Sequence, residues 1–138
     1  KRDHVNILLV EDNPGDARSG QEMLNDVHTL KYTLTNVTTL AQARDFLSHN
    51  VPDVVLLDLA LPDGKGLKCT SRLMESFPAV PFVILTGLDN EMVGLESVRA
   101  GAQDYLVKGQ IDGKSLARVI SYSTERKSCW TKSQGVPI

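Results

Sequence analysis

Five short apolar runs, separated by segments of helical periodicity, constrain the fold of this chain more than any other feature. The runs lie at residues 5–10, 32–37, 53–57, 81–85 and 104–107. Four of them are almost continuously apolar with β-branched centres, which is typical of strands buried on both faces. The run at 32–37 alternates two sets of side chains, and we expect it to be an edge strand with one wetter face.

Each run is followed by a segment that carries helix signals. Asn13 precedes Pro14, which is the order expected of an N-cap residue and a first helical position. Thr39 and Gln42 fit a capping box, in which two side chains bond to the free amides of a helix start. The other helices are expected over residues 67–77, from Asp89 to Arg99 with Gly101 as the stop, and over residues 111–127.

Strands that alternate with helices in this way predict an α/β fold. Right-handed crossovers bring such strands into one parallel sheet and place helices on both of its faces. The length of 138 residues suits one domain, and the composition, 41% hydrophobic and 23% charged, is that of a globular protein. We therefore expect a doubly wound sheet that folds without disulfides or a metal.

Charge and hydropathy exclude several classes of protein. Lys and Arg total 15 and Asp and Glu total 17, so the net charge of −2 gives no reason to expect binding to nucleic acid or to an anionic membrane. The apolar runs are far shorter than the ~20 residues of a membrane span, and no secretory signal follows the basic start. Cys69 and Cys129 are too far apart in sequence to form a metal-ligand pair. We expect a cytoplasmic protein, and the first residue, Lys1, indicates part of a longer chain.

The residues that follow each run matter most for function, because ligands of a doubly wound sheet bind beyond the carboxyl ends of its strands. They are Glu11 and Asp12 after the first run, Asp58 after the third, Thr86 and Gly87 after the fourth, and Lys108 after the fifth. If the first and third strands are neighbours, three carboxylates converge on one pocket. A hydroxyl and an ammonium group then lie on its far side.

Three carboxylates in one pocket predict a bound cation. Two charges ~4 Å apart repel by about 4 kcal/mol at an effective dielectric constant near 20, so either one carboxyl group takes up a proton or a hard cation neutralises the cluster. Mg²⁺ prefers carboxylate and carbonyl oxygens and keeps part of its water shell. A divalent ion beside Lys108 predicts a phosphate ligand, and an aspartate carboxylate can itself accept a phosphoryl group.

Four motifs in this order closely resemble the receiver domain of two-component response regulators. They are Leu-Leu-Val-Glu-Asp-Asn at 8–13, Leu-Leu-Asp-Leu-Ala-Leu-Pro-Asp-Gly at 56–64, Val-Ile-Leu-Thr-Gly at 83–87 and Gly-Ala-Gln-Asp-Tyr-Leu-Val-Lys at 101–108. The resemblance covers residues 4–127 and leaves 128–138 as a linker or disordered tail. It implies a flavodoxin-like (βα)5 three-layer sandwich with a five-stranded parallel sheet in the order 2-1-3-4-5.

The resemblance implies a role for each acidic residue. Asp58 is identified as the phosphoacceptor, which takes its phosphoryl group from a sensor histidine kinase or a histidine phosphotransfer protein. Asp12, Asp58 and the backbone carbonyl of Ala60 are expected to bind Mg²⁺ (or Mn²⁺) directly. Glu11 is expected to reach the same ion through a water molecule.

The resemblance also implies roles for residues around the acceptor. Lys108 is expected to pair with a phosphoryl oxygen, and the hydroxyl of Thr86 to turn toward the phosphate. The backbone at Gly87 and Ala60 is expected to face the phosphate, with Gly87 keeping its approach open. Tyr105 resembles the aromatic switch residue that swings inward as Thr86 moves.

A signalling protein rather than an enzyme is therefore expected, one that catalyses only its own phosphorylation and dephosphorylation. An output domain or partner protein would read the surface formed by the fourth helix, the fifth sheet strand and the fifth helix. The domain itself is expected to bind neither nucleic acid nor membrane and to be a monomer or weak dimer.

One position departs from the family pattern, because the lysine is followed by Gly109 where the family usually has a proline in a cis peptide. A cis bond before a non-proline residue costs about 2.5–4 kcal/mol, so the Lys108–Gly109 bond is expected to be trans or strained, in a more flexible loop. Gly109 also favours an alternative, a protein-binding module that keeps the scaffold but works without phosphate. A third interpretation, a flavodoxin-like nucleotide or flavin binder, is disfavoured by the acidic loop after the first strand.

Overall fold

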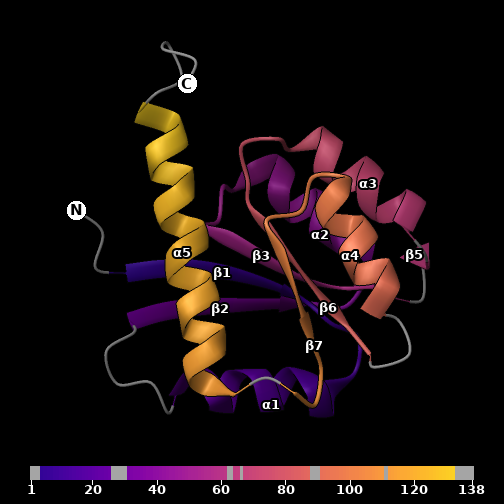
Figure 1. The fold of residues 1–138 in the computed structure, drawn as a ribbon, viewed down its shortest axis with the longest axis vertical. Coiled ribbons are helices and arrows are strands. Elements are labelled where there is room, and N and C mark those ends of the chain that lie inside the picture. The colour runs from indigo at the N-terminus through magenta and orange to yellow at the C-terminus, as the bar shows by residue number, and fades with distance from the viewer. Residues whose placement is uncertain are drawn as a thin grey trace.

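The structure of the chain, a computed structural model, describes residues 4–25, 31–61, 64–65, 67–87, 91–110 and 112–132. A parallel sheet of five strands lies at its centre in the order β2-β1-β3-β6-β7 (Figure 1). The strands are β1 (His4–Val10), β2 (Lys31–Val37), β3 (Val54–Asp58), β6 (Phe82–Thr86) and β7 (Asp104–Val107). Counted along the chain, this is the order 2-1-3-4-5, so the expected doubly wound, flavodoxin-like fold is confirmed.

The register of the sheet brings the carboxyl ends of its strands to one edge. The paired residues near these ends are Val10 and Leu57, Asp58 and Leu85, and Thr86 and Val107. Because β1, β3, β6 and β7 end nearly level with one another, the residues that follow them are neighbours in space. This edge of the sheet is where the sequence places the candidate site.

Helices cover both faces of the sheet (Figure 1). They are α1 (Pro14–Asn25), α2 (Leu40–His49), α3 (Leu67–Ser76), α4 (Glu91–Arg99) and α5 (Gly113–Lys132). One core lies under α2, α3 and α4 and includes Leu8, Val10, Leu57, Ile84, Leu47 and Leu73. The other lies under α1 and α5 and includes Ile7, Leu9, Leu56, Leu85, Leu24 and Leu116. Successive strand residues enter opposite cores, and each buried side chain of this size contributes about 1.5–3 kcal/mol.

Two helix starts use the caps that the sequence predicts. The side-chain oxygen of Asn13 accepts hydrogen bonds from the two backbone amides that follow Pro14, at 2.8 and 3.1 Å. The hydroxyl of Thr39 accepts from the backbone amide of Gln42 at 3.1 Å. The Gln42 side chain in turn accepts from the backbone amide of Thr38 at 2.8 Å, so the capping box reaches one residue further back than expected.

The end of α4 also follows the prediction. Gly101 has a positive φ of 130° directly after the helix, a conformation that glycine adopts readily. Its amide donates to the carbonyl of Val98, and the amide of Ala102 donates to that of Ser97. The expected cap at Asp89 lies outside the described residues.

The last helix is longer than predicted. It ends at Lys132 rather than at residue 127, and Figure 1 shows its C-terminal end projecting beyond the sheet. The physical reason is that neither glycine nor proline occurs from Lys114 to Gln134, so nothing interrupts the helix. The assignment of residues 128–138 to a linker or tail stays a prediction. In the described part of the chain, no helix combines the length and hydropathy that crossing a membrane requires.

A short antiparallel pair after β3 was not predicted. It consists of β4 (Ala60–Leu61) and β5 (Gly64–Lys65). Strands of two residues are too short to show an alternating pattern in sequence, although Asp63-Gly64 is a turn signal there. The first residue of the pair, Ala60, follows Asp58 by two positions in the sequence.

Candidate functional site

Three carboxyl groups converge at the carboxyl ends of β1 and β3. Glu11, Asp12 and Asp58 each offer one carboxylate oxygen, and these oxygens lie within 4.8 Å of one another. Glu11 and Asp58 are 2% and 5% exposed, whereas Asp12 is exposed to solvent. The convergence predicted from the strand order is therefore present in the structure.

The position of Glu11 follows from the sheet. Its backbone amide donates to the carbonyl of Val37 at 2.9 Å, which continues the pairing between β1 and β2 by one residue. Its carboxylate accepts a hydrogen bond from the backbone amide of Asn13 at 3.2 Å. The loop that caps α1 therefore also holds the Glu11 side chain against the sheet.

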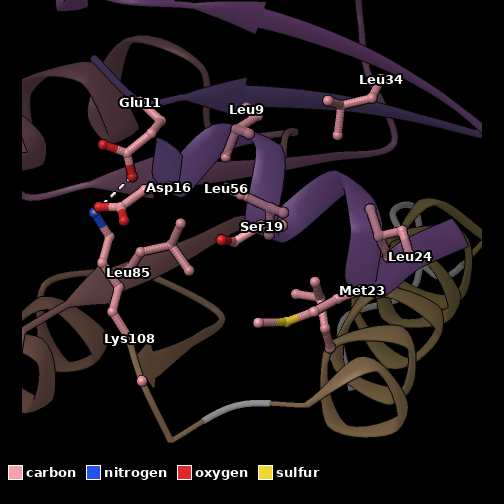
Figure 2. A pocket seen from close by; sticks show the side chains of 13 residues that line it. Leu9, Glu11, Asp16, Ser19, Met23, Leu24, Leu34, Leu56, Leu85 and Lys108 are labelled. Atoms are coloured by element: carbon pink, nitrogen blue, oxygen red, sulfur yellow. Dashed lines mark hydrogen bonds and ion pairs between the residues drawn. The ribbon is translucent and has the colours of Figure 1, made fainter. Parts of the chain in front are cut away.

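Lys108 joins the cluster from the end of β7. Its Nζ lies 2.6 Å from Glu11 Oε1, 3.1 Å from Asp58 Oδ2 and 3.0 Å from Asp16 Oδ2. Its backbone amide donates to the carbonyl of Thr86 at 2.7 Å, which fixes the start of the side chain beside β6. Figure 2 shows the ammonium group between Glu11 and Asp16.

Asp16 is a member of this cluster that the sequence analysis missed. It lies in the first turn of α1, and its side chain is half exposed. The Asn13-Pro14 cap sets the direction of α1, and the position of Asp16 one turn later brings its carboxylate to Lys108. Its sequence signal is its place in the acidic loop after the first strand, but Asp16 does not directly follow a strand end.

Gly109 forms an ordered turn. The peptide bond between Lys108 and Gly109 is trans, and Gly109 has a φ of +87°. The amide of Gln110 donates to the carbonyl of Val107 at 3.0 Å, which closes a β-turn with glycine at its third residue. Of the two expectations for this bond, trans is correct. The expected flexibility of the loop stays a prediction.

The environment of Glu11 favours its neutral form. Burial, together with a hydrogen bond to the Asp58 carboxyl group, raises the pKa of Glu11 from 4.5 to about 7, although the bond with Lys108 acts in the opposite direction. The site without a metal therefore holds a proton on Glu11 in a large share of molecules near neutral pH. A cation that binds the carboxylate must displace this proton.

Lys108 stays charged in the same environment. Burial alone would lower the pKa of its ammonium group, but the hydrogen bonds to Glu11 and Asp16 and the charge of Asp58 raise that pKa above its usual value. A permanent positive charge thus lies 3.1 Å from the predicted phosphoacceptor. Such a charge stabilises a phosphoryl group that arrives there.

Thr86 is a buried hydroxyl at the end of β6. It is 1% exposed, and among the described residues its Oγ1 has no hydrogen-bond partner. A buried polar atom left in this state costs about 1–3 kcal/mol, so it marks a position where a ligand oxygen can compensate. This agrees with the predicted role of Thr86 toward a phosphate.

Tyr105 packs against α4 and the core that α4 covers. A Cβ atom built on Gly94 would lie 2.7 Å from Tyr105 Cδ2 and 2.9 Å from Thr86 Cγ2. Only a residue without a side chain therefore lets α4 approach the Tyr105 ring and the Thr86 methyl group together. Gly94 is a second residue that sequence reasoning missed, because a glycine inside a helix gives no sign of what it contacts.

Two backbone positions complete the surroundings of Asp58. A Cβ atom built on Gly87 would meet nothing within 4 Å, so the space in front of this residue is open. Ala60 begins β4, two residues after Asp58. Their predicted contacts with phosphate and metal stay predictions.

The acidic cluster fits a hard divalent cation. Two oxygens bound to one Mg²⁺ lie about 3–4 Å apart, since each bond is about 2.1 Å long. The three carboxylate oxygens are already within 4.8 Å of one another, so small side-chain shifts suffice. Glu11, Asp12 and Asp58 are therefore the residues that would hold the ion.

Known proteins resemble this chain over the region that contains the site. A family model described as the response regulator receiver domain matches residues 7–120. The oxygen regulatory protein NreC of Staphylococcus epidermidis is 32% identical over 114 residues, which are 81% of this chain and 52% of NreC. The swarming motility regulation protein RssB of Serratia marcescens is 36% identical over 104 residues, which are 75% of this chain and 46% of RssB. The chain thus spans about half the length of these relatives.

Solved structures share the fold. The signal receiver domain of a putative LuxO repressor protein from Vibrio parahaemolyticus superposes with a TM-score of 0.79 at 22% identity, covering 98% of this chain and 99% of that one. NtrX from Brucella abortus superposes with a TM-score of 0.84 at 20% identity, covering 98% of this chain and 30% of NtrX. The range matched by the family model includes every carboxylate of the cluster as well as Lys108.

Proposed function

The chain belongs to the response regulator receiver family, and we propose that Asp58 accepts a phosphoryl group from the phosphohistidine of a sensor kinase or phosphotransfer protein. The observation that carries the proposal is the position of Lys108 Nζ, 3.1 Å from Asp58 Oδ2, beside three converging carboxyl groups. A nucleophilic carboxylate, a cation site and a fixed ammonium group are what transfer to an aspartate requires.

The proposed chemical step is a displacement at phosphorus. An oxygen of Asp58 attacks phosphorus, the new P–O bond forms, and the P–N bond to the donor imidazole breaks, with the electron pair leaving on nitrogen. Mg²⁺, when bound, neutralises the negative charge shared by the carboxylates and the phosphoryl oxygens. Lys108 donates to a phosphoryl oxygen once it gives up part of its contact with the carboxylates. The hydroxyl of Thr86 gains the partner that it lacks in this structure.

The response to phosphorylation follows from the packing around Thr86. Its methyl group and the ring of Tyr105 share the space against Gly94 of α4, so a displacement of Thr86 toward the phosphate frees room for the ring. We propose that this rearrangement changes the surface formed by α4, β7 and α5. An output domain or partner protein would read the change, because a ligand shifts a two-state surface by its differential affinity.

The protein-binding module that works without phosphate has less support. Gly109 was the feature that favoured it, and Gly109 forms a hydrogen-bonded turn that leaves Lys108 in contact with Asp58. The acidic cluster is also intact. A phosphate-operated receiver accounts for both observations.

Asp58→Asn tests the proposal. We expect the wild-type chain incubated with acetyl phosphate and Mg²⁺ to gain the mass of one phosphoryl group and the Asp58→Asn variant to gain none, since an amide is not a nucleophile here. Asp45→Asn, a change at an exposed residue of α2, is the matched control and should label like the wild type. Labelling of Asp58→Asn to the wild-type level would show that the acceptor lies elsewhere.

A further inference from the structure

A cavity of about 250 Å³ lies between α1, α5 and the sheet, next to the acidic cluster. Its walls are leucine and methionine side chains of the core under α1 and α5, mainly Leu9, Leu34, Leu56, Leu85, Leu116 and Met23. Figure 2 shows Ser19 and Met23 extending from α1 toward this space. The cavity is thus apolar along its walls and polar at one end.

Two small residues leave this space unfilled. Ser19 and Gly20 follow one another on α1 and both line the cavity. A Cβ atom built on Gly20 would meet nothing within 4 Å, whereas one on Gly94 collides with two side chains. Gly20 therefore lies beside empty space, and a glycine inside a helix costs about 0.5–1 kcal/mol relative to alanine. Nothing in the packing of α1 requires this glycine.

The polar end of the cavity carries excess negative charge. Glu11, Asp16 and Lys108 line it, and Asp58 contacts the same ammonium group. Asp16 uses Oδ2 to bind Lys108, and its side chain is half exposed. Three acidic groups therefore surround one lysine, with Asp12 nearby. An anionic ligand would have to displace a carboxylate from Lys108, whereas a cationic group finds Asp16 at the entrance.

We propose that this cavity binds a small primary amine with a compact apolar ring system. The volume is slightly below the roughly 300–1,000 Å³ of pockets for drug-sized ligands, which limits the occupant to about one bicyclic ring. The ring lies among the leucine side chains, and the ammonium group binds the carboxylate of Asp16. Burial of the ring supplies the affinity, and the charge selects the amine over neutral and acidic analogues.

Occupancy of the cavity acts on the phosphorylation site through Lys108. An ammonium group on Asp16 competes with Lys108 for the same carboxylate and leaves the lysine with Glu11 and Asp58. The amine would then change the rate at which Asp58 is labelled. This coupling rests on the proposed function, whereas binding to the cavity does not.

Tryptamine, 3-methylindole and indole-3-acetate are suitable probes, because they share the indole ring and differ in charge. Binding to the full chain is measured by NMR titration, with and without Mg²⁺. We expect tryptamine to bind with a Kd on the order of 1 mM or tighter, at least about fivefold tighter than 3-methylindole, with the acid weakest. Intermolecular NOEs from the indole protons to the Met23 and Leu34 methyl groups should place the ring in the cavity.

Two substitutions of one glycine separate filling of the cavity from effects on the helix. Gly20→Leu places a side chain in the cavity and should weaken tryptamine binding at least about tenfold. Gly20→Ala also raises helix propensity but leaves most of the volume, and it should change the affinity less than about twofold. Asp16→Asn should remove the preference for the amine over 3-methylindole while leaving the affinity for 3-methylindole unchanged.

The outcomes are distinct from those of the phosphorylation test. Amine binding is measured without a phosphodonor, so it can succeed or fail whether or not Asp58 accepts a phosphoryl group. Absence of NOEs to Met23 and Leu34, or equal binding by wild type and Gly20→Leu, would overturn the proposal. Tighter binding of indole-3-acetate than of tryptamine would also overturn it, because Lys108 would then select the ligand.

Discussion

Glu11 carries a carboxyl group that the fold removes almost entirely from water. It is 2% exposed, and burial together with Asp58 raises its pKa to about 7. Lys108 compensates part of this cost with a contact of 2.6 Å. In the folded chain the Glu11 carboxyl group is therefore largely protonated below about pH 7, and a cation would bind its ionised form.

A dependence of stability on pH follows from this pKa. The folded chain binds a proton at Glu11 that the unfolded chain releases above about pH 4.5, so the stabilisation is fully present below that pH and is lost as the pH rises through 7. In EDTA we expect Glu11 to lower the free energy of unfolding by on the order of 2 kcal/mol between about pH 5 and about pH 7.5. Urea unfolding at a series of pH values measures this change.

Glu11→Gln should flatten that dependence, since an amide does not titrate. Glu22→Gln, at an exposed position of α1, should keep it. If Glu11→Gln and the wild type lost stability equally over this range, the proton would be bound elsewhere.

At the scale of whole elements, α4 and α1 differ in what surrounds one glycine of each helix, Gly94 and Gly20. Gly94 lets α4 lie against the Tyr105 ring and the Thr86 methyl group, whereas Gly20 in α1 lies beside open space. Both glycines are inside helices, so each lowers helix propensity by a similar amount. They differ only in their steric surroundings. The close approach of α4 to the sheet thus depends on Gly94, whereas α1 makes no such contact at Gly20.

Alanine at these two positions should have effects of opposite sign. Gly94→Ala would bring Cβ within 3 Å of two side chains, and we expect a loss of about 1–3 kcal/mol in the free energy of unfolding despite the better helix propensity. Gly20→Ala should add about 0.5–1 kcal/mol, since the space is open. Thermal and urea unfolding of both variants measure the difference. A stabilising Gly94→Ala would mean that α4 does not pack as closely as described.

At the scale of the whole molecule, the site connects residues that follow or end three different strands of the sheet. Glu11 follows β1, Asp58 ends β3, and Lys108 follows β7, so the cluster joins strands from the middle and one edge of the sheet. A cation that binds these groups binds only the folded chain, because the unfolded chain does not bring them together. Metal binding and global stability are therefore linked.

Mg²⁺ should stabilise the entire domain as a result. At a free concentration 100 times its Kd, we expect the free energy of unfolding to rise by about 2.7 kcal/mol, and by less at about pH 5, where Glu11 holds its proton. Urea unfolding in Mg²⁺, compared with NaCl of equal ionic strength, measures the effect. Asp58→Asn should reduce the gain, and an equal gain in that variant would place the ion outside the proposed cluster.

The sequence was sufficient for the main helices and strands and for most of their caps. Apolar runs and caps such as Asn13 and Thr39 predict the elements, because backbone geometry and local hydrogen bonds depend on neighbouring residues. The convergence of Glu11, Asp58 and Lys108 was also predictable, since parallel strands end at one edge of a sheet. The family resemblance added their roles.

Tertiary structure decided what depends on distances between helices and the sheet. Asp16 reaches Lys108, 92 residues later in the sequence, only because the fold brings the first turn of α1 and the end of β7 within reach of the lysine side chain. Gly94 and Gly20 are the same residue type in the same type of element, and only packing makes one a close contact and the other the wall of a cavity. Sequence patterns report which face of an element is apolar, whereas the space left between two apolar faces is set by the packing of all side chains at once.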